Sequence, residues 1–187
     1  MTQPAAKPMT TREKLLHHAR RLLWARGYSN VSVRQIAAAA GVDVALISRY
    51  YGSKLGLFEV TLENAFDDPS AHANTPEQVM DMMTHLFVHT PRCGDMPSIV
   101  QMILTNAQDD DVGEMVRGLT HRHFHAPLLR ILGSPQRTAL FMSVLMGISV
   151  VEKTIRLPGY PAPHSSDYAA MLRHMMQAAL SYKGPEK

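Results

Sequence analysis

Helix-start signals recur along this chain, and they restrict its fold more than any other feature. Residues 10–13 (Thr-Thr-Arg-Glu) form a capping box, in which a hydroxyl and a carboxylate each satisfy a backbone amide at a helix start. Residues 32–35 and 75–78 repeat this pattern. Apolar residues follow each box at helical spacing, and no segment alternates as a strand does. We therefore expect an all-α protein.

Glycine and proline mark where these helices end. Gly27 and Gly41 follow the first two apolar runs, and Pro91 follows the run that begins at Pro76. Pro127 predicts a kink or interruption within a longer helix. The expected helices cover residues 10–26, 32–40, 44–51, 53–66, 76–90, 96–107, 110–132, 135–156 and 166–182.

The second and third of these helices have the spacing of a helix-turn-helix. Two helices that cross steeply need a small residue at their closest approach and a turn residue that tolerates positive φ, and Ala37 and Gly41 occupy these places. Ile47, ten residues after Ala37, would point back into the same core. The short third helix could then enter the major groove of DNA. An ordinary pair of packed helices with solvent-exposed basic residues is the alternative.

Charge favours an anionic partner for this part of the chain. The net charge is +3, but residues 1–66 contain nine Lys and Arg against four Asp and Glu, a net of +5. Nucleic acid and an acidic membrane surface both fit such a charge, as does a solvated basic face. For DNA, side chains on the third helix would meet the bases and flanking side chains the phosphates. The candidates are Ser32, Arg34, Val44, Ala45, Leu46, Ser48, Arg49, Tyr50, Tyr51 and Lys54.

The stretch GYSNVSVRQIAAAAGVDVALISRYYGSKLGLF, residues 27–58, resembles the DNA-binding module of the tetracycline-repressor (TetR) family of bacterial transcription regulators. The similarity covers residues 12–66. It implies an all-α fold of about nine helices. Its parts would be a tail (1–9), a helix-turn-helix domain (10–53), a connecting helix (54–66) and a ligand-binding and dimerisation domain (67–187).

Two positions depart from the family pattern. The family usually has glycine and then Leu-Tyr in the recognition helix, where this chain has Ala45 and Ile47-Ser48, which predicts a different base preference. Acidic residues usually follow Ser-Lys, whereas here Leu55-Gly56 stand there and are expected to weaken the cap of the fourth helix.

Two C-terminal helices are candidates for a dimer interface. The helix over 135–156 is apolar almost all round and carries a small residue at every fourth position, so another helix can approach it closely. The resemblance implies a four-helix interface with a second copy, whereas completing the monomer's own core is the alternative. The interface candidates are Ala139, Ser143, Gly147, Tyr168, Met171, Leu172, Met175, Met176 and Ala179.

The chain contains thirteen methionines, whose flexible side chains suit either an irregular core or a pocket for an apolar or aromatic ligand. The resemblance favours a pocket for a small-molecule effector. The candidates for its lining are Met83, Phe87, Ile103, His123, Phe124 and Met146, with His123 as a polar anchor.

Metal binding and catalysis find little support. His121, His123 and His125 alternate, and alternate residues lie on opposite faces of an α-helix, so they cannot chelate as a unit unless Pro127 breaks the helix. Glycine-rich nucleotide loops, Gly-x-Ser-x-Gly and His-Glu-x-x-His are all absent from the sequence. Asp109-Asp110-Asp111 fits an acidic helix start. We expect a non-enzyme with no metal and no cofactor.

The single Cys93 and the absence of an apolar stretch long enough to span a bilayer predict a cytoplasmic protein with no membrane partner. The leading hypothesis is a homodimeric repressor that binds a palindromic double-stranded DNA operator and is released by a small effector. A helical carrier protein that never engages DNA, and an enzyme with an unrecognised site, remain as alternatives.

Overall fold

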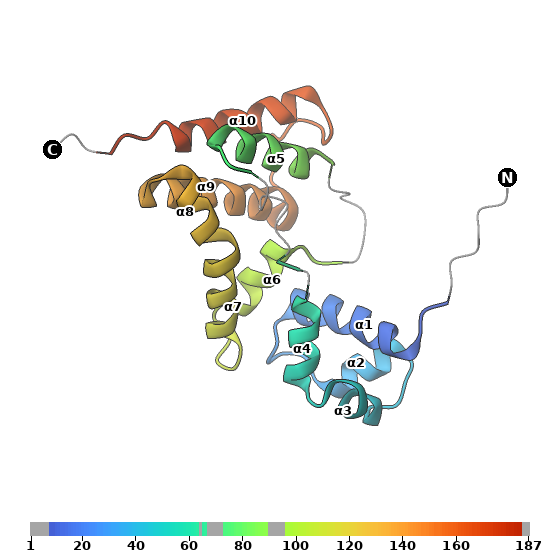
Figure 1. The fold of residues 1–187 in the computed structure, drawn as a ribbon. Coiled ribbons are helices and arrows are strands. Elements are labelled where there is room, and N and C mark those ends of the chain that lie inside the picture. The colour runs from blue at the N-terminus through green and yellow to red at the C-terminus, as the bar shows by residue number, and fades with distance from the viewer. Residues whose placement is uncertain (1–7, 64, 67–72, 90–95, 185–187) are drawn as a thin grey trace. The chain divides into compact units, whose positions relative to one another are not determined.

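The computed structural model describes residues 8–63, 65–66, 73–89 and 96–184, and within these ranges it contains helices and no strand (Figure 1). The expected all-α class is confirmed. The predicted tail (1–9) and the polar boundary segment (67–74) lie largely outside the described residues, and Pro91 and Cys93 lie wholly outside them.

The chain divides into two compact units. The head unit comprises residues 1–66 and 95–116, and the second unit comprises residues 67–94 and 117–187. The head unit contains α1 (Thr11–Arg26), α2 (Val33–Ala40), α3 (Ala45–Tyr51), α4 (Lys54–Leu62) and α6 (Ile99–Asn106). The second unit contains α5 (Pro76–His89), η2 (His121–His125), α8 (Ala126–Leu132), α9 (Pro135–Ile148), η3 (Ser149–Ile155) and α10 (Ser166–Leu180), and α7 (Gly113–Thr120) crosses the division.

The expected caps are present in the head unit. The amide of Glu13 donates to the Thr10 hydroxyl (3.3 Å) and the amide of Thr10 donates to the Glu13 carboxylate (2.8 Å). Gly27 ends α1, and Gly41 ends α2 in the left-handed conformation (φ 67°, ψ 37°). Because a side chain at such a positive φ is strained, glycine suits this turn.

The structure corrects the expectation that Gly56 weakens the start of α4. The amide of Gly56 donates to the Ser53 hydroxyl at 3.0 Å, so the cap is formed. A Cβ atom at position 56 would lie 2.3 Å from the backbone oxygen of Tyr51. Glycine therefore permits the close approach of α4 to the end of α3. The helix stops at Leu62, four residues before the expected end.

Helix α6 packs against α1 through a buried polar residue. The Asn106 Oδ1 accepts from the amide of Tyr28 (2.7 Å), and its Nδ2 donates to the carbonyls of Leu23 (3.2 Å) and Met102 (3.0 Å). Asn106 is fully buried, so these bonds satisfy groups that water cannot reach. The helix begins at Ile99, capped by Ser98, rather than at residue 96. The grouping of α6 with the head differs from the predicted boundary at residue 67.

The core of the second unit lies between α5, α8, α9 and α10, and α5 and α10 lie side by side (Figure 1). Phe141 of α9 and Leu172 of α10 are buried in it, together with Val79 and Phe87 of α5. The side chains of Arg173 and Asp81 form an ion pair (2.5 Å) across α10 and α5. A continuous apolar cluster therefore holds these elements together.

Two expected long helices contain π-helical segments. The first, η2, ends two residues before Pro127, and the amide of Ala126 donates to the carbonyl of His121. Proline has no amide hydrogen and its ring clashes with the carbonyl four residues earlier, which accounts for the widened turn. The second, η3, ends at Ile155, and the Arg156 that follows it has a positive φ of 57°.

Candidate nucleic-acid interface

Helix α3 is held on the head by one face. Ile47 is 2% exposed and points into the head core with Tyr51. The Asp43 carboxylate accepts from the amide of Ala45, the first residue of the helix, at 2.7 Å. The remaining face of α3 is left at the surface.

Most of the predicted DNA-contacting side chains lie on this surface. Leu46 and Lys54 are half-buried. The exposed members are Arg34, Val44, Ala45, Ser48, Arg49 and Tyr50, joined by Ser32 at the start of α2.

Tyr51 does not belong to this set, because the structure turns it inward. It is 9% exposed, whereas Tyr50 is 37% exposed. The Tyr51 hydroxyl donates to the backbone carbonyl of Arg12 at 2.6 Å, and the Arg12 guanidinium lies 5.6 Å from the ring centroid. Burial raises the pKa of Tyr51, against the opposing effect of Arg12. Tyr51 therefore joins α3 to α1, and Tyr50 is the exposed one of the two tyrosines.

Ser32 is exposed but already bonded. Its amide donates to the Gln35 side-chain oxygen (2.8 Å), and its hydroxyl accepts from the amide of Gln35 (3.2 Å). The capping box therefore already uses both the amide and the hydroxyl of Ser32. A phosphate contact at this corner would depend on Arg34.

Lys54 sits in the first turn of α4 and is held by an aromatic ring. Its Nζ lies 4.1 Å from the ring centroid of Tyr28, within the range of a cation–π interaction. Desolvation lowers the pKa of Lys54, while Asp109 and Asp111 act in the opposite direction. The phenol of Tyr28 responds to the same surroundings, because burial raises its pKa and both aspartates add to that effect.

The acidic segment after α6, Asp109 to Asp111, acts on the pKa values of Lys54 and Tyr28. From the sequence we expected this segment only to begin a helix. The Asp109 carboxylate accepts from the amide of Ser29 (2.9 Å), and it also accepts from the amides of Asp111 (3.1 Å) and Val112 (3.3 Å). Burial acts to raise the pKa of Asp109, but these hydrogen bonds outweigh it and the pKa is lowered. Local pattern could not reveal the contact with Ser29, which lies eighty residues earlier.

The predicted pocket residues are distributed over both units. Met83 and Phe87 are buried in the core of the second unit, and Met146 is half-buried on α9. Ile103 is buried on α6 in the head unit. His123 and Phe124 are half-buried on η2, the π-helical segment.

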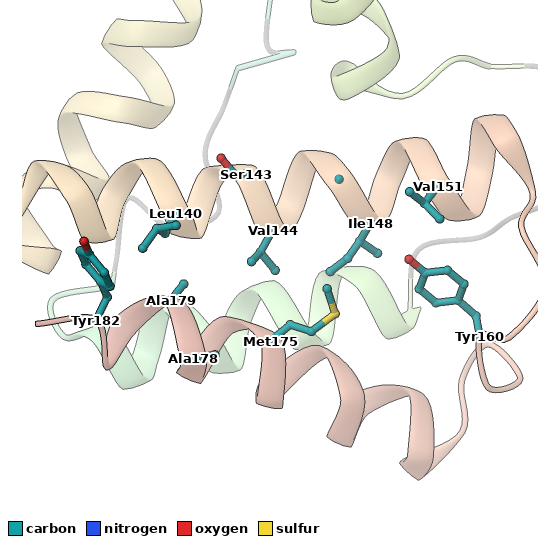
Figure 2. A pocket seen from close by; sticks show the side chains of 11 residues that line it. Leu140, Ser143, Val144, Ile148, Val151, Tyr160, Met175, Ala178, Ala179 and Tyr182 are labelled. Carbon is teal, nitrogen blue, oxygen red and sulfur yellow. The ribbon is translucent and has the colours of Figure 1, made fainter. Parts of the chain in front are cut away.

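The second unit has an apolar groove between α9 and α10, with a volume of about 540 Å³. Figure 2 shows Leu140, Val144 and Ile148 pointing from α9 toward α10, with Tyr182 at one end and Tyr160 at the other. None of the six predicted pocket residues lines it.

The predicted interface residues divide between this groove and the core. Ser143, Gly147, Met175 and Ala179 line the groove, and Ala139 is exposed beside it. Tyr168, Leu172 and Met176 are buried in the core of their own chain, and so is Ala179, whereas Met171 is half-buried. A role for these residues in a dimer interface remains a prediction.

The histidines form pairs rather than a chelating cluster. The rings of His121 and His125 stack with centroids 4.9 Å apart, and those of His85 and His89 lie 4.3 Å apart. Within the described ranges, no group of three or more His, Cys, Asp or Glu side chains is placed to hold a metal ion. The helices in these same ranges are too short or too polar to cross a membrane.

Two family models match the chain. The model described as "Bacterial regulatory proteins, tetR family" matches residues 15–61, and that described as "Tetracyclin repressor-like, C-terminal domain" matches residues 77–180. A curated relative, the probable HTH-type transcriptional regulator YttP of Bacillus subtilis (strain 168), is 35% identical over 86 residues. That match spans 40% of this chain and 41% of the relative.

Solved structures share the fold along nearly the whole chain. Mycobacterium smegmatis AmtR aligns with a TM-score of 0.60 and 16% identity, covering 98% of this chain and 92% of AmtR. A cysteine mutant of the TetR family transcriptional regulator CifR, complexed with 26-base-pair double-strand operator DNA, aligns with a TM-score of 0.62 and 20% identity over 96% and 98% of the two chains. A tetR-family regulator from Streptomyces coelicolor aligns with a TM-score of 0.57 and 18% identity, covering 90% and 78%.

Proposed function

The chain belongs to the tetR family of bacterial transcriptional regulators, and from this premise we propose that it is a homodimeric repressor that binds a palindromic DNA operator. Its proposed function is binding rather than catalysis. Its partners would be double-stranded DNA, a second copy of itself and a small effector. We place it in the cytoplasm, where an operator would be found.

The observation that carries the DNA-binding proposal is the exposed face of α3, with basic and hydroxyl side chains at the surface around it. The helix is short, is anchored by Ile47, and presents small and polar side chains together with Arg49. Arg34 on α2, Tyr50 near the end of α3 and Lys54 at the start of α4 can donate to phosphates. Phosphate donors therefore lie beside the part of α3 that would enter the groove. A carrier protein that binds only an apolar ligand has no use for this arrangement.

The exposed seam on α9 supports the homodimer. Ala139, Ser143 and Gly147 recur at every fourth position and all three are exposed, and a Cβ at Gly147 would meet nothing within 4 Å. The apolar groove beside the seam continues to α10. A second copy related by a two-fold axis would cover this face, and it would bring a second α3 to a half-site about 34–36 Å away or a multiple of this distance.

The effector site is proposed within the second unit. The core around Met83 and Phe87 contains several methionines, which adapt to ligands of variable shape. His123 and Phe124 lie on the π-helical segment η2, and such segments often occur at functional sites. An effector that prefers one of two head spacings by about 1–3 kcal/mol would release the operator.

The DNA-binding proposal is tested with the full chain and a duplex from its own promoter region. Affinity should fall steeply with salt, on the order of 10³-fold between 50 and 200 mM if about six phosphates are neutralised. Lys54→Ala and Tyr50→Phe should each weaken binding at constant salt without changing the mass of the dimer. Tyr51→Phe is the matched control, because that hydroxyl is bonded within the head.

The DNA-binding proposal fails if the wild-type chain binds no duplex in a salt-dependent manner. A carrier function would then be supported by ligand binding without DNA binding, and an enzyme by turnover of the identified ligand.

The dimer is tested by a charge in the seam. Gly147→Glu should convert the dimer to monomer in sedimentation velocity, because a carboxylate would be buried without a partner. Gly118→Glu places the same charge on an exposed helical position with nothing within 4 Å and should leave the dimer intact. A dimer that survives Gly147→Glu at unchanged affinity contradicts the proposed face.

A further inference from the structure

The angular positions of residues around α3 single out one outward side chain. Ile47 and Tyr51 are the buried residues of this helix, and they lie one turn apart. At about 100° per residue, the direction about 180° from the midpoint of this buried pair is that of Arg49. Ala45, one turn earlier, lies about 40° from Arg49. These two residues therefore form the crest of the exposed face.

The other surface residues of α3 lie on either side of this crest. Ser48 lies on one side, and Tyr50 and the half-buried Leu46 lie on the other. Val44 precedes the helix, and its direction is only about 40° from that of the buried pair. When a helix enters the major groove, its crest faces the base edges and its flanks face the two phosphate backbones. Arg49 thus has the position of a base-reading residue, whereas Tyr50 has that of a phosphate contact.

The chemistry of the crest specifies a base. Arg49 is exposed, and no ion pair with a described acidic side chain holds its guanidinium. A guanidinium can donate two parallel hydrogen bonds to O6 and N7 of guanine, which is the commonest specific contact in the major groove. Ala45 offers only a methyl group, which can pack against the C5-methyl of thymine.

We propose that Arg49 reads a guanine in each half-site of the operator and that Ala45 contacts a thymine methyl nearby. Four residues of helix rise about 6 Å, which corresponds to roughly two base-pair steps of about 3.4 Å. The proposal rests on the proposed DNA-binding function, and it adds which residues select the sequence.

The test starts from operators selected from random duplex DNA with the full wild-type chain. Each half-site should contain a guanine whose replacement weakens binding about 10- to 100-fold. In the Arg49→Ala variant, replacing this guanine should not change the affinity further. Replacing bases at the other operator positions should still weaken binding as it does for the wild type. Replacing that guanine by 7-deazaguanine, which lacks the N7 acceptor, should weaken the wild type but not the variant.

The thymine contact is tested in the same way. Deoxyuridine, which lacks the C5-methyl, should weaken binding of the wild type at a position about two base pairs from the guanine. Ala45→Gly should be insensitive to that replacement. Arg34→Ala serves as the control for a phosphate contact, because it should weaken all sequences alike and reduce the salt slope by about one.

Three results would decide against the inference. If Arg49→Ala weakens every sequence uniformly, as Arg34→Ala does, Arg49 contacts a phosphate. If the guanine preference persists in Arg49→Ala, another residue reads it. If the selected half-sites contain no required guanine while binding remains specific, the assignment is wrong although the proposed function stands. Absence of any salt-dependent duplex binding would instead remove the proposed function itself.

Discussion

Replacing Gly56 by alanine tests the close approach of α4 to the end of α3. In an exposed helix this substitution usually stabilises a protein by about 0.5–1 kcal/mol, because alanine loses less backbone entropy on folding. At position 56 the added Cβ would lie 2.3 Å from the carbonyl oxygen of Tyr51. The oxygen belongs to the backbone, so the start of α4 must move to relieve the clash.

The sign of the effect is therefore expected to reverse. Overpacking of this kind costs about 1–3 kcal/mol. The favourable propensity of alanine offsets part of this cost, which leaves a net loss of stability of about 1 kcal/mol within a range of about 0–2.5 kcal/mol. A change of 1 kcal/mol corresponds to roughly 2–4 °C in Tm for a chain of this size. The displaced turn also carries Lys54, so operator affinity should fall as well.

The measurement uses the single tryptophan as a local probe. Trp24 is 1% exposed, and its indole N–H donates to the Thr61 hydroxyl of α4 at 3.0 Å, so its fluorescence reports the packing of α1 against α4. Urea unfolding of Gly56→Ala followed by this fluorescence should show a lower midpoint. Gly118→Ala is the control, because a Cβ there meets nothing within 4 Å and circular dichroism should show a small gain. A Gly56→Ala variant as stable as the wild type would refute the argument from close approach.

Three further predictions concern the head unit. Asn106→Ala should lower the unfolding free energy by about 1–3 kcal/mol, because it leaves the buried amide of Tyr28 without its acceptor; an unchanged urea midpoint would contradict this. Tyr51→Phe should cost about 1 kcal/mol in the same assay while leaving operator affinity intact, since its hydroxyl bonds the carbonyl of Arg12. The pKa of Asp109 is lower in the folded chain than in the unfolded chain. Its carboxylate therefore contributes to folding stability above the unfolded-state pKa of about 3.9, and this stabilisation is lost as pH falls through the folded-state pKa. The unfolding free energy of Asp109→Asn should therefore fall less steeply than that of the wild type below about pH 4. If the two plots of unfolding free energy against pH run parallel, the carboxylate contributes nothing.

The sequence was most informative where the determining interactions are local. The capping boxes at 10–13 and 32–35 form as expected, because each involves groups three residues apart. The box at 75–78 forms only in part, since the Gln78 side chain accepts from the amide of Asn74 rather than that of Thr75. Helix ends with glycine at positive φ were also readable, because backbone sterics at Gly27 and Gly41 act within one residue.

Neighbouring residues of one type could not be separated without the fold. Tyr50 and Tyr51 are equivalent in a phosphate-binding hypothesis, and only the direction of the α3 core face turns one outward and the other toward Arg12. Two neighbouring methionines of α10 divide in the same way, because Met176 faces the core while Met175 lines the groove.

The sequence by itself determined the helical class, the helix-turn-helix and the caps, since these follow from hydrogen bonds and periodicities that span a few residues. Only the tertiary structure decided that α6 packs with the head, through Asn106 and partners about eighty residues earlier in the chain. It also decided that Gly56 is required rather than tolerated and that Lys54 meets Tyr28 near an acidic turn. Such contacts depend on which helix faces meet, and that choice is made by the burial of the whole apolar surface rather than by any local segment.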